Sequence, residues 1–94
     1  MKIKVGDCFY LGGYHFHRRK FKEKFIIVSE ILPNQVTTWV KDHHASYWHR
    51  LEFRVSDSKA ILFFGNYVEF YYSKTGKKKA KEIWKDFLSW RMNK

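Results

Sequence analysis

The 94-residue sequence predicts a single domain of the α+β class, a small antiparallel β-barrel or roll of five to seven strands with one C-terminal helix. Two patterns predict this class. Short runs of β-branched and aromatic residues, separated by turn residues, occupy positions 1–73. Helical spacing of apolar residues occurs only over positions 75–92. The length suits one domain rather than two.

The N-terminal part of the chain predicts short strands and a basic loop. Lys2–Leu11 reads as a short strand that the turn signal Gly6-Asp7 interrupts. Residues 14–17 alternate between aromatic rings and the histidines His15 and His17, which is typical of a second strand or an extended arm. A cluster of cations follows. We expect it at a loop or hairpin tip, because like charges repel one another in a packed face. Its members are Arg18, Arg19, Lys20, Lys22 and Lys24.

The middle of the chain predicts a β-hairpin. Phe25–Leu32 is rich in β-branched residues and is expected to be a buried strand, and Gln35–Lys41 is the next strand. Pro33 fixes a negative φ, so it cannot occupy the first position of a primed turn. We therefore expect a four-residue loop around a type I turn rather than a two-residue loop.

Ala45–Val55 is predicted to be one long strand with two different faces. Its odd-numbered positions are mostly apolar and are expected to face the core, His49 among them. Its even-numbered positions place Trp48 beside the cations Arg50 and Arg54. A displayed tryptophan among cations is suited to stacking on bases and neutralising phosphates.

A second hairpin and a helix complete the predicted elements. Ile61–Phe64 and Tyr67–Tyr72 flank Gly65-Asn66, which favours a type II′ turn. Lys77–Met92 has helical periodicity, and Thr75 is its expected N-cap. The apolar stripe of this helix consists of Ala80, Ile83, Trp84, Phe87 and Leu88.

The first turn of the predicted helix contains three lysines, Lys77, Lys78 and Lys79. The helix dipole disfavours cations at this end. This local misfit suggests that the lysines serve a purpose other than helix stability.

The composition limits the classes of partner. Lys and Arg number 19 against 9 Asp and Glu, which gives a formal net charge of +10, and aromatic residues make up 20% of the chain. Such a balance attracts nucleic acid, an anionic membrane surface or an acidic protein, and it argues against a mimic of DNA. The sequence leaves the oligomeric state open.

Cysteine content and hydropathy indicate the compartment. The single cysteine, Cys8, excludes an internal disulfide and a cysteine-based zinc site, and it fits a reducing compartment. The N-terminus shows no signal-peptide pattern, and no run approaches the roughly 20 apolar residues of a spanning helix. We expect a cytoplasmic protein without a membrane partner.

Three short segments carry a family resemblance: Lys4-Val5-Gly6-Asp7-Cys8-Phe9, then Phe25-Ile26-Ile27-Val28, then Val36-Thr37. Together they resemble the start of a small SH3-like or KOW-type barrel, in which Val-Gly-Asp precedes the first strand and a hairpin follows. Several ribosome-, RNA- and phage-associated modules are similar. The basic segment 18–24 and the C-terminal helix depart from that pattern, and the resemblance assigns no functional residue.

These observations predict a non-enzymatic protein that binds an anionic partner, most directly nucleic acid, without a cofactor or metal. Cations neutralise phosphates, and aromatic rings stack on exposed bases. The expected phosphate contacts are Arg18, Arg19, Lys20, Lys22, Lys24, Lys77, Lys78 and Lys79. Trp48, Arg50 and Arg54 are expected to add stacking and orientation.

Two alternatives remain open at this point. A phage-type inhibitor or adaptor that docks on an acidic or nucleic-acid-binding protein complex would use the same residue types, because Trp, Tyr and Arg dominate protein interfaces. A metal-independent nuclease would use histidines as general acid and base, and His15 and His17 would project from one face of a strand. The sequence contains no HExxH motif, and we assign no catalytic residue.

Overall fold

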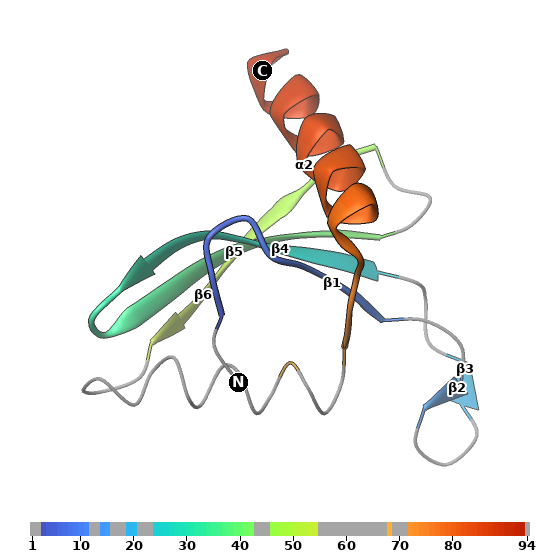
Figure 1. Ribbon diagram of the computed structural model, residues 1–94, viewed down its shortest axis with the longest axis horizontal. Helices are drawn as coiled ribbons and strands as arrows, with labels where there is room; N and C mark the ends of the chain where they lie inside the picture. The colour runs from blue at the N-terminus through green and yellow to red at the C-terminus, as the bar shows by residue number, and fades with distance from the viewer. Residues whose placement is uncertain are drawn as a thin grey trace.

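The computed structural model describes residues 3–11, 14–15, 19–20, 24–42, 46–54, 68 and 72–93, with the backbone alone at 14–15 and 19–20. Five strands form one antiparallel sheet in the order β6-β5-β4-β1-β7 (Figure 1). They are β1 (Cys8–Leu11), β4 (Lys24–Leu32), β5 (Gln35–Asp42), β6 (His49–Arg54) and β7 (Ser73–Lys74). The short strands β2 (Tyr14–His15) and β3 (Arg19–Lys20) pair separately, and helix α2 (Lys77–Met92) ends the described chain.

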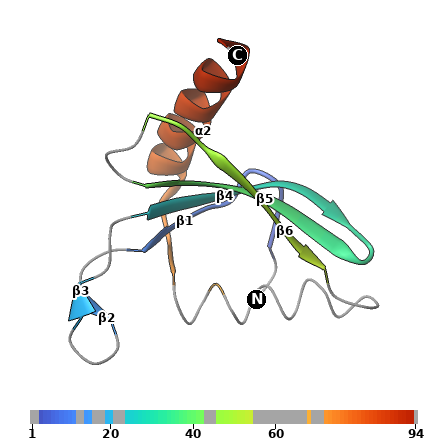
Figure 2. The same cartoon turned by 180° about the vertical axis from the view of Figure 1, so that it is seen from behind.

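This arrangement confirms the predicted α+β class, with an antiparallel sheet and a C-terminal helix. Figure 2 shows the same molecule from behind, with α2 standing against one face of a twisted sheet. Among the described strands, β6 and β7 lie at opposite edges and do not pair with each other. The sheet is therefore open, and roll describes it better than barrel.

The central hairpin forms as predicted, but its loop is shorter. Leu32 pairs with Gln35, so Pro33 and Asn34 alone connect β4 to β5, and the prediction of a four-residue loop is wrong. Ordinary type I and type II turns accept proline at the first of their two central positions, so this connection needs no primed geometry. A bulge after Val28 adds a residue to β4, and bulges increase the local twist of a hairpin.

The long strand predicted over Ala45–Val55 is wrong in its extent and in part of its facing. The strand begins only at His49, which is exposed rather than part of the core. Leu51 is 44% exposed, because an edge strand has a neighbour on one side only. Trp48 precedes the strand and does not follow its alternation. Its side chain is only 4% exposed, so the prediction of a displayed tryptophan is wrong.

The predicted hairpin over residues 61–72 falls mostly outside the described residues. Val68 has helical backbone, and its carbonyl accepts a 2.6 Å hydrogen bond from the amide of Tyr72. A bond from residue i+4 to residue i belongs to a helical turn, so the predicted strand Tyr67–Tyr72 is wrong at this point. The Val68 side chain is fully buried and joins the core.

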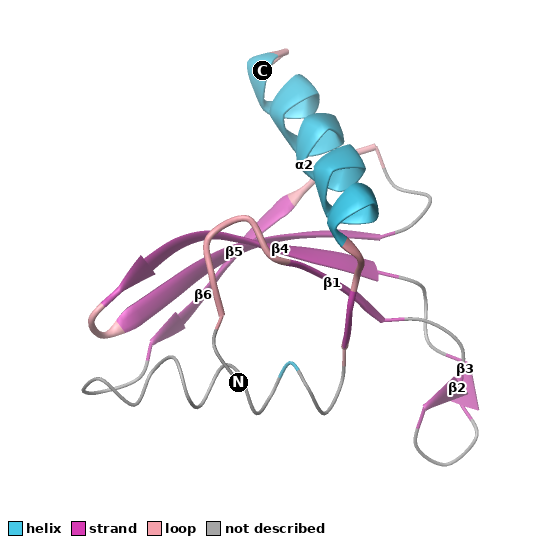
Figure 3. Ribbon diagram, in the orientation of Figure 1, coloured by secondary structure: helices cyan, strands magenta, loops and turns pink. Residues whose placement is uncertain are grey.

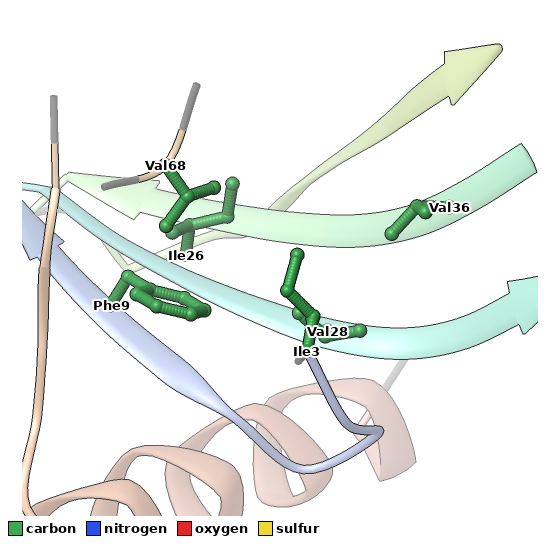
Figure 4. Packing of buried hydrophobic residues seen from close by; sticks show 6 residues of the cluster. All are labelled: Ile3, Phe9, Ile26, Val28, Val36 and Val68. Atoms are coloured by element: carbon green, nitrogen blue, oxygen red, sulfur yellow. The ribbon is translucent and has the colours of Figure 1, made fainter. Parts of the chain in front are cut away.

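The sheet buries an apolar cluster on each face, because successive residues of a strand point to opposite faces. Partners across an antiparallel ladder share a face, so each cluster extends over several strands. The cluster on the face away from the helix is shown in Figure 4 and comprises Ile3, Phe9, Ile26, Val28, Val36 and Val68. The cluster between the sheet and α2 comprises Cys8, Phe25, Ile27, Trp48, Ile83 and Phe87. Burial on both faces explains why β4 contains an unbroken run of buried residues rather than a strict alternation.

Helix α2 has the bounds that the sequence predicts. Ile83 and Phe87 are buried as expected, whereas Leu88 is half exposed and lies away from the sheet. The N-cap position is Gly76 rather than Thr75, and no side chain caps the helix. The Thr75 hydroxyl instead donates to the carbonyl of Gly76, 3.2 Å away.

Replacing Phe87 by alanine should lower the free energy of unfolding by about 3–5 kcal/mol, because the ring is buried among aromatic neighbours that cannot collapse onto the space. Leu88→Ala, one position further along the helix, should change it by about 0.5 kcal/mol or less. Urea denaturation measures both values. Similar losses in the two variants would contradict the observed facing of α2.

Candidate functional site

Lysines gather where β7 leads into α2, a short connection that Figure 3 shows between the last strand and the helix. Lys74 lies at the sheet edge, where it pairs with Phe9 of β1. Three residues later the helix begins with the exposed lysines Lys77, Lys78 and Lys79. The Lys4–Asp7 turn and the next turn of α2 bring two further lysines to the same place, as the hollows below show.

The first hollow lies between the Lys4–Asp7 turn, β7 and α2 and has a volume of about 420 Å³. Its polar lining includes four lysines, Lys4, Lys74, Lys77 and Lys81, and one carboxylate, that of Asp7. The Oδ2 atom of Asp7 accepts a 2.9 Å hydrogen bond from the Lys4 amide and lies 3.5 Å from the Lys74 ammonium. One carboxylate among four ammonium groups leaves the hollow strongly positive.

One hydrogen bond joins the turn to the helix. The indole Nε1–H of Trp84 donates to the carbonyl of Gly6, at 2.8 Å. Gly6 has φ +100°, a left-handed conformation that a residue with a Cβ atom adopts only with strain. The glycine of the Gly6-Asp7 turn signal therefore permits the turn that carries Lys4 and Asp7 to the helix.

The second hollow adjoins the first, shares Lys74 and Thr75 with it, and has a volume of about 440 Å³. Its other lining residues are Tyr10, Phe25, Ser73, Gly76 and Lys79. Tyr10 pairs with Phe25 across one ladder and with Ser73 across another, so all three lie on the helix-facing side of the sheet. None of the described residues that line this hollow is acidic.

Aromatic rings form the wall of the second hollow. The rings of Tyr10 and Phe25 lie 5.1 Å apart with an interplanar angle of 40°. The Lys79 ammonium lies 5.5 Å from the centroid of the Phe25 ring, which is a cation–π distance. Phe25 is only 6% exposed, whereas Tyr10 is half-buried, so Tyr10 offers the more accessible ring.

The start of α2 adds a positive potential of its own. The first amides of any helix have no acceptor within the helix, and here no side chain caps them. No acidic residue lies in the first turn. Lys79 lies 3.9 Å from Glu82, but both side chains are half exposed, so this pair contributes little. The helix dipole and the lysines therefore favour the binding of an anion at the same place.

The structure places the other predicted binding residues away from this junction. Arg50 and Arg54 share one face of β6 as expected, but Glu52 lies between them, 2.7 Å and 3.8 Å from their guanidinium groups. Lys24 begins β4 and lies 3.9 Å from Asp42, its partner on β5. These carboxylates compete with any phosphate for the cations.

Trp48 lies inside the molecule, with its ring centroid 5.2 Å from that of Phe87. Its burial removes it from the set of stacking residues. Arg19 and Lys20 form β3, whose backbone pairs with β2, in agreement with a basic hairpin. Arg18 and Lys22 lie outside the described residues, as do the histidines at positions 17, 43 and 44.

Lys4, Tyr10 and Asp7 belong to the site but are not predicted by sequence reasoning. They lie more than sixty residues before the helix in the chain. The pairing of β1 with β7, the hydrogen bond from the Thr75 amide to the Cys8 carbonyl and the hydrogen bond from Trp84 bring them to the start of α2. No local pattern in the sequence signals either contact.

Comparison with protein-family models, with curated proteins and with solved structures finds no match to this chain. In the part of the chain that the structure describes, no three His, Cys, Asp or Glu side chains are grouped so that they can hold a metal ion. A search of the same residues finds no helix with the length and apolarity needed to cross a bilayer.

Cys8 lies behind the first hollow and is 1% exposed. Burial raises the pKa of its thiol from 9.0 to about 11. A hydrogen bond with Thr75 and the charge of Lys79 lower this pKa, and the charge of Asp7 raises it, each by less than burial does. The thiol is therefore neutral at physiological pH and is a poor nucleophile.

The raised pKa of Cys8 predicts a loss of stability at alkaline pH. Between pH 9 and 11 the unfolded thiol loses its proton while the folded thiol keeps it, so the free energy of unfolding should fall as pH rises. The contribution is at most about 2.7 kcal/mol. Urea denaturation of the wild type and of Cys8→Ala across this range isolates it, since the two proteins differ at this residue alone. A constant difference between the two proteins would contradict the prediction.

Proposed function

We propose that this protein is a non-enzymatic binding protein that contacts nucleic acid through the lysine-rich surface at the start of α2. The observation that carries the proposal is the gathering of six lysines around an uncapped helix N-terminus, where the described structure pairs only Lys74 and Lys79 with carboxylates, those of Asp7 and Glu82. Phosphate groups match both the ammonium groups and the helix amides. The lysines of this surface are Lys4, Lys74, Lys77, Lys78, Lys79 and Lys81.

The shape of the surface favours a chain of phosphates over a single anion. The two hollows lie side by side, and Lys74 lines both of them. Cations therefore flank the β7–α2 connection over two neighbouring sites. A polyanion that crosses the connection can contact both sites and release a counterion at each phosphate that it brings.

The position of the lysines also points to a ligand. Lys77, Lys78 and Lys79 oppose the helix dipole, and the described structure gives Lys77 and Lys78 no ion-pair partner. Each cation in this turn costs helix stability of about 0.3–1 kcal/mol at low salt. A bound phosphate reverses the sign of that interaction.

A docking function on a protein complex is a second proposal, favoured by a different observation. Leu88 is 50% exposed and Met92 is 84% exposed, and they lie one turn apart on the outer side of α2. Apolar side chains of this kind supply contact area at protein interfaces. Partners that survive nuclease treatment in a pull-down, and that Leu88→Ala with Met92→Ala removes, would favour this second function.

Removing two charges at the start of α2 should weaken the binding of an oligonucleotide about tenfold. Lys77→Gln with Lys79→Gln should also reduce the slope of log K against log salt by about 1.4–1.8, because two fewer counterions are released. Fluorescence anisotropy with a labelled oligonucleotide between about 50 and 200 mM salt measures both quantities.

Arg50→Gln with Arg54→Gln is the matched control, because it removes the same net charge from a strand where both arginines pair with Glu52. It should leave the affinity and the salt slope nearly unchanged. Equal effects of the two double variants would show a diffuse response to net charge and would refute the assignment to α2. A salt-independent affinity of the wild type would refute nucleic-acid binding through phosphates.

A further inference from the structure

We infer that the second hollow receives an unstacked nucleobase, so that the protein prefers single-stranded nucleic acid to a duplex. This inference rests on the proposed function of the lysine-rich surface. It adds to that function a base-binding residue, Tyr10, and a strandedness for the ligand. Stacking on an aromatic ring requires a base whose face is free, and bases within a duplex are already stacked on their neighbours.

The wall of the hollow fits a flat, uncharged ring. Tyr10 is held in place by Phe25, whose ring lies 5.1 Å away, and by its position in the middle of a ladder between β7 and β4. A fixed ring loses little entropy when a base stacks on it. The volume of about 440 Å³ lies within the range of small-ligand sites and suits one nucleotide rather than a helix of base pairs.

The rim of the hollow fits the phosphate of the same nucleotide. Lys74, Lys79 and the backbone of Gly76 line it, and the described lining contains no carboxylate. Asp7 lies 3.5 Å from the Lys74 ammonium and Glu82 lies 3.9 Å from that of Lys79, but neither acidic residue is among those that line this hollow. The second hollow therefore combines an aromatic wall with two exposed lysines, and no carboxylate is among its described lining residues.

A third hollow, of about 450 Å³, has an aromatic wall but lacks the basic rim of the second hollow. It lies near the end of α2 and is lined by Ser46, Tyr47, Asp86, Ser89, Trp90 and Asn93. Tyr47 is 48% exposed, but the ring packs edge-on against His49 with centroids 4.7 Å apart. Its charged lining residue is Asp86, which pairs with Lys41, and no lysine is among the described residues that line it. Exposed aromatic surface alone does not make a nucleotide site.

The test compares strands that carry the same phosphates with and without bases. Labelled oligodeoxyuridine and oligouridine of about 12 nucleotides, an abasic deoxyribose-phosphate strand of equal length and a duplex are titrated by fluorescence anisotropy. Either base-containing single strand should bind at least about fivefold more tightly than the abasic strand, and more tightly than the duplex. The stronger of the two identifies the preferred sugar.

Tyr10→Leu should weaken binding of the base-containing strands about 5- to 160-fold, which is the range for one stacked base. It should leave binding of the abasic strand and the salt slope unchanged. Tyr10→Phe keeps the ring and should bind like the wild type, so it separates stacking from any loss of fold in Tyr10→Leu.

Equal affinity for the abasic and base-containing strands would overturn the inference and leave phosphate binding at α2 intact. A duplex that binds as tightly as the single strand, or a Tyr10→Phe variant that loses affinity as Tyr10→Leu does, would overturn it as well. If no strand binds at low salt, both the inference and the proposed function fail.

Discussion

The packing of Phe87 holds the molecule together, because it is the contact that fixes α2 on the sheet. Its ring centroid lies 5.2 Å from those of Trp39 on β5 and Trp48 before β6, and 5.8 Å from that of Trp84 on the same helix. Large rings bury much apolar area each, and this allows a chain of 94 residues to dock its helix firmly. Lys41 adds a polar contact to Asp86 near the middle of the helix.

This docking determines where the helix begins. With Phe87 anchored, Trp84 reaches the Gly6 carbonyl, and the first turn of α2 lies beside β7 and the Lys4–Asp7 turn. The structural core thus places the lysines of three separate segments around one uncapped helix end. The lysines lower the stability of the first helical turn slightly, because they repel the positive end of the helix dipole. A bound anion would offset this repulsion.

Local patterns in the sequence predict which segments form strands and helices better than they predict which segments pack against each other. The spacing from Ala80 to Phe87 predicts α2 with its observed bounds, and the β-branched run predicts β4. Period-two alternation, extended past the start of β6, predicts Trp48 on a polar face, whereas the ring packs in the apolar cluster between the sheet and α2. Periodicity separates the faces of a strand but does not say where the strand begins.

The candidate site shows the same limit more strongly. Lys77, Lys78 and Lys79 attract notice in the sequence because they conflict with the helix dipole. Tyr10 and Lys4 give no such signal, since their roles depend on strand pairing across most of the chain.

The most direct test of the central claim is an NMR titration of ¹⁵N-labelled protein with a short single-stranded oligonucleotide at low salt. We predict that the largest changes in amide chemical shift occur at Gly76, Lys77 and Lys78, at the end of β7, and around Tyr10. We predict small changes along β6. If the protein binds the oligonucleotide but the shift changes centre on β6 and spare the start of α2, that result would contradict this prediction.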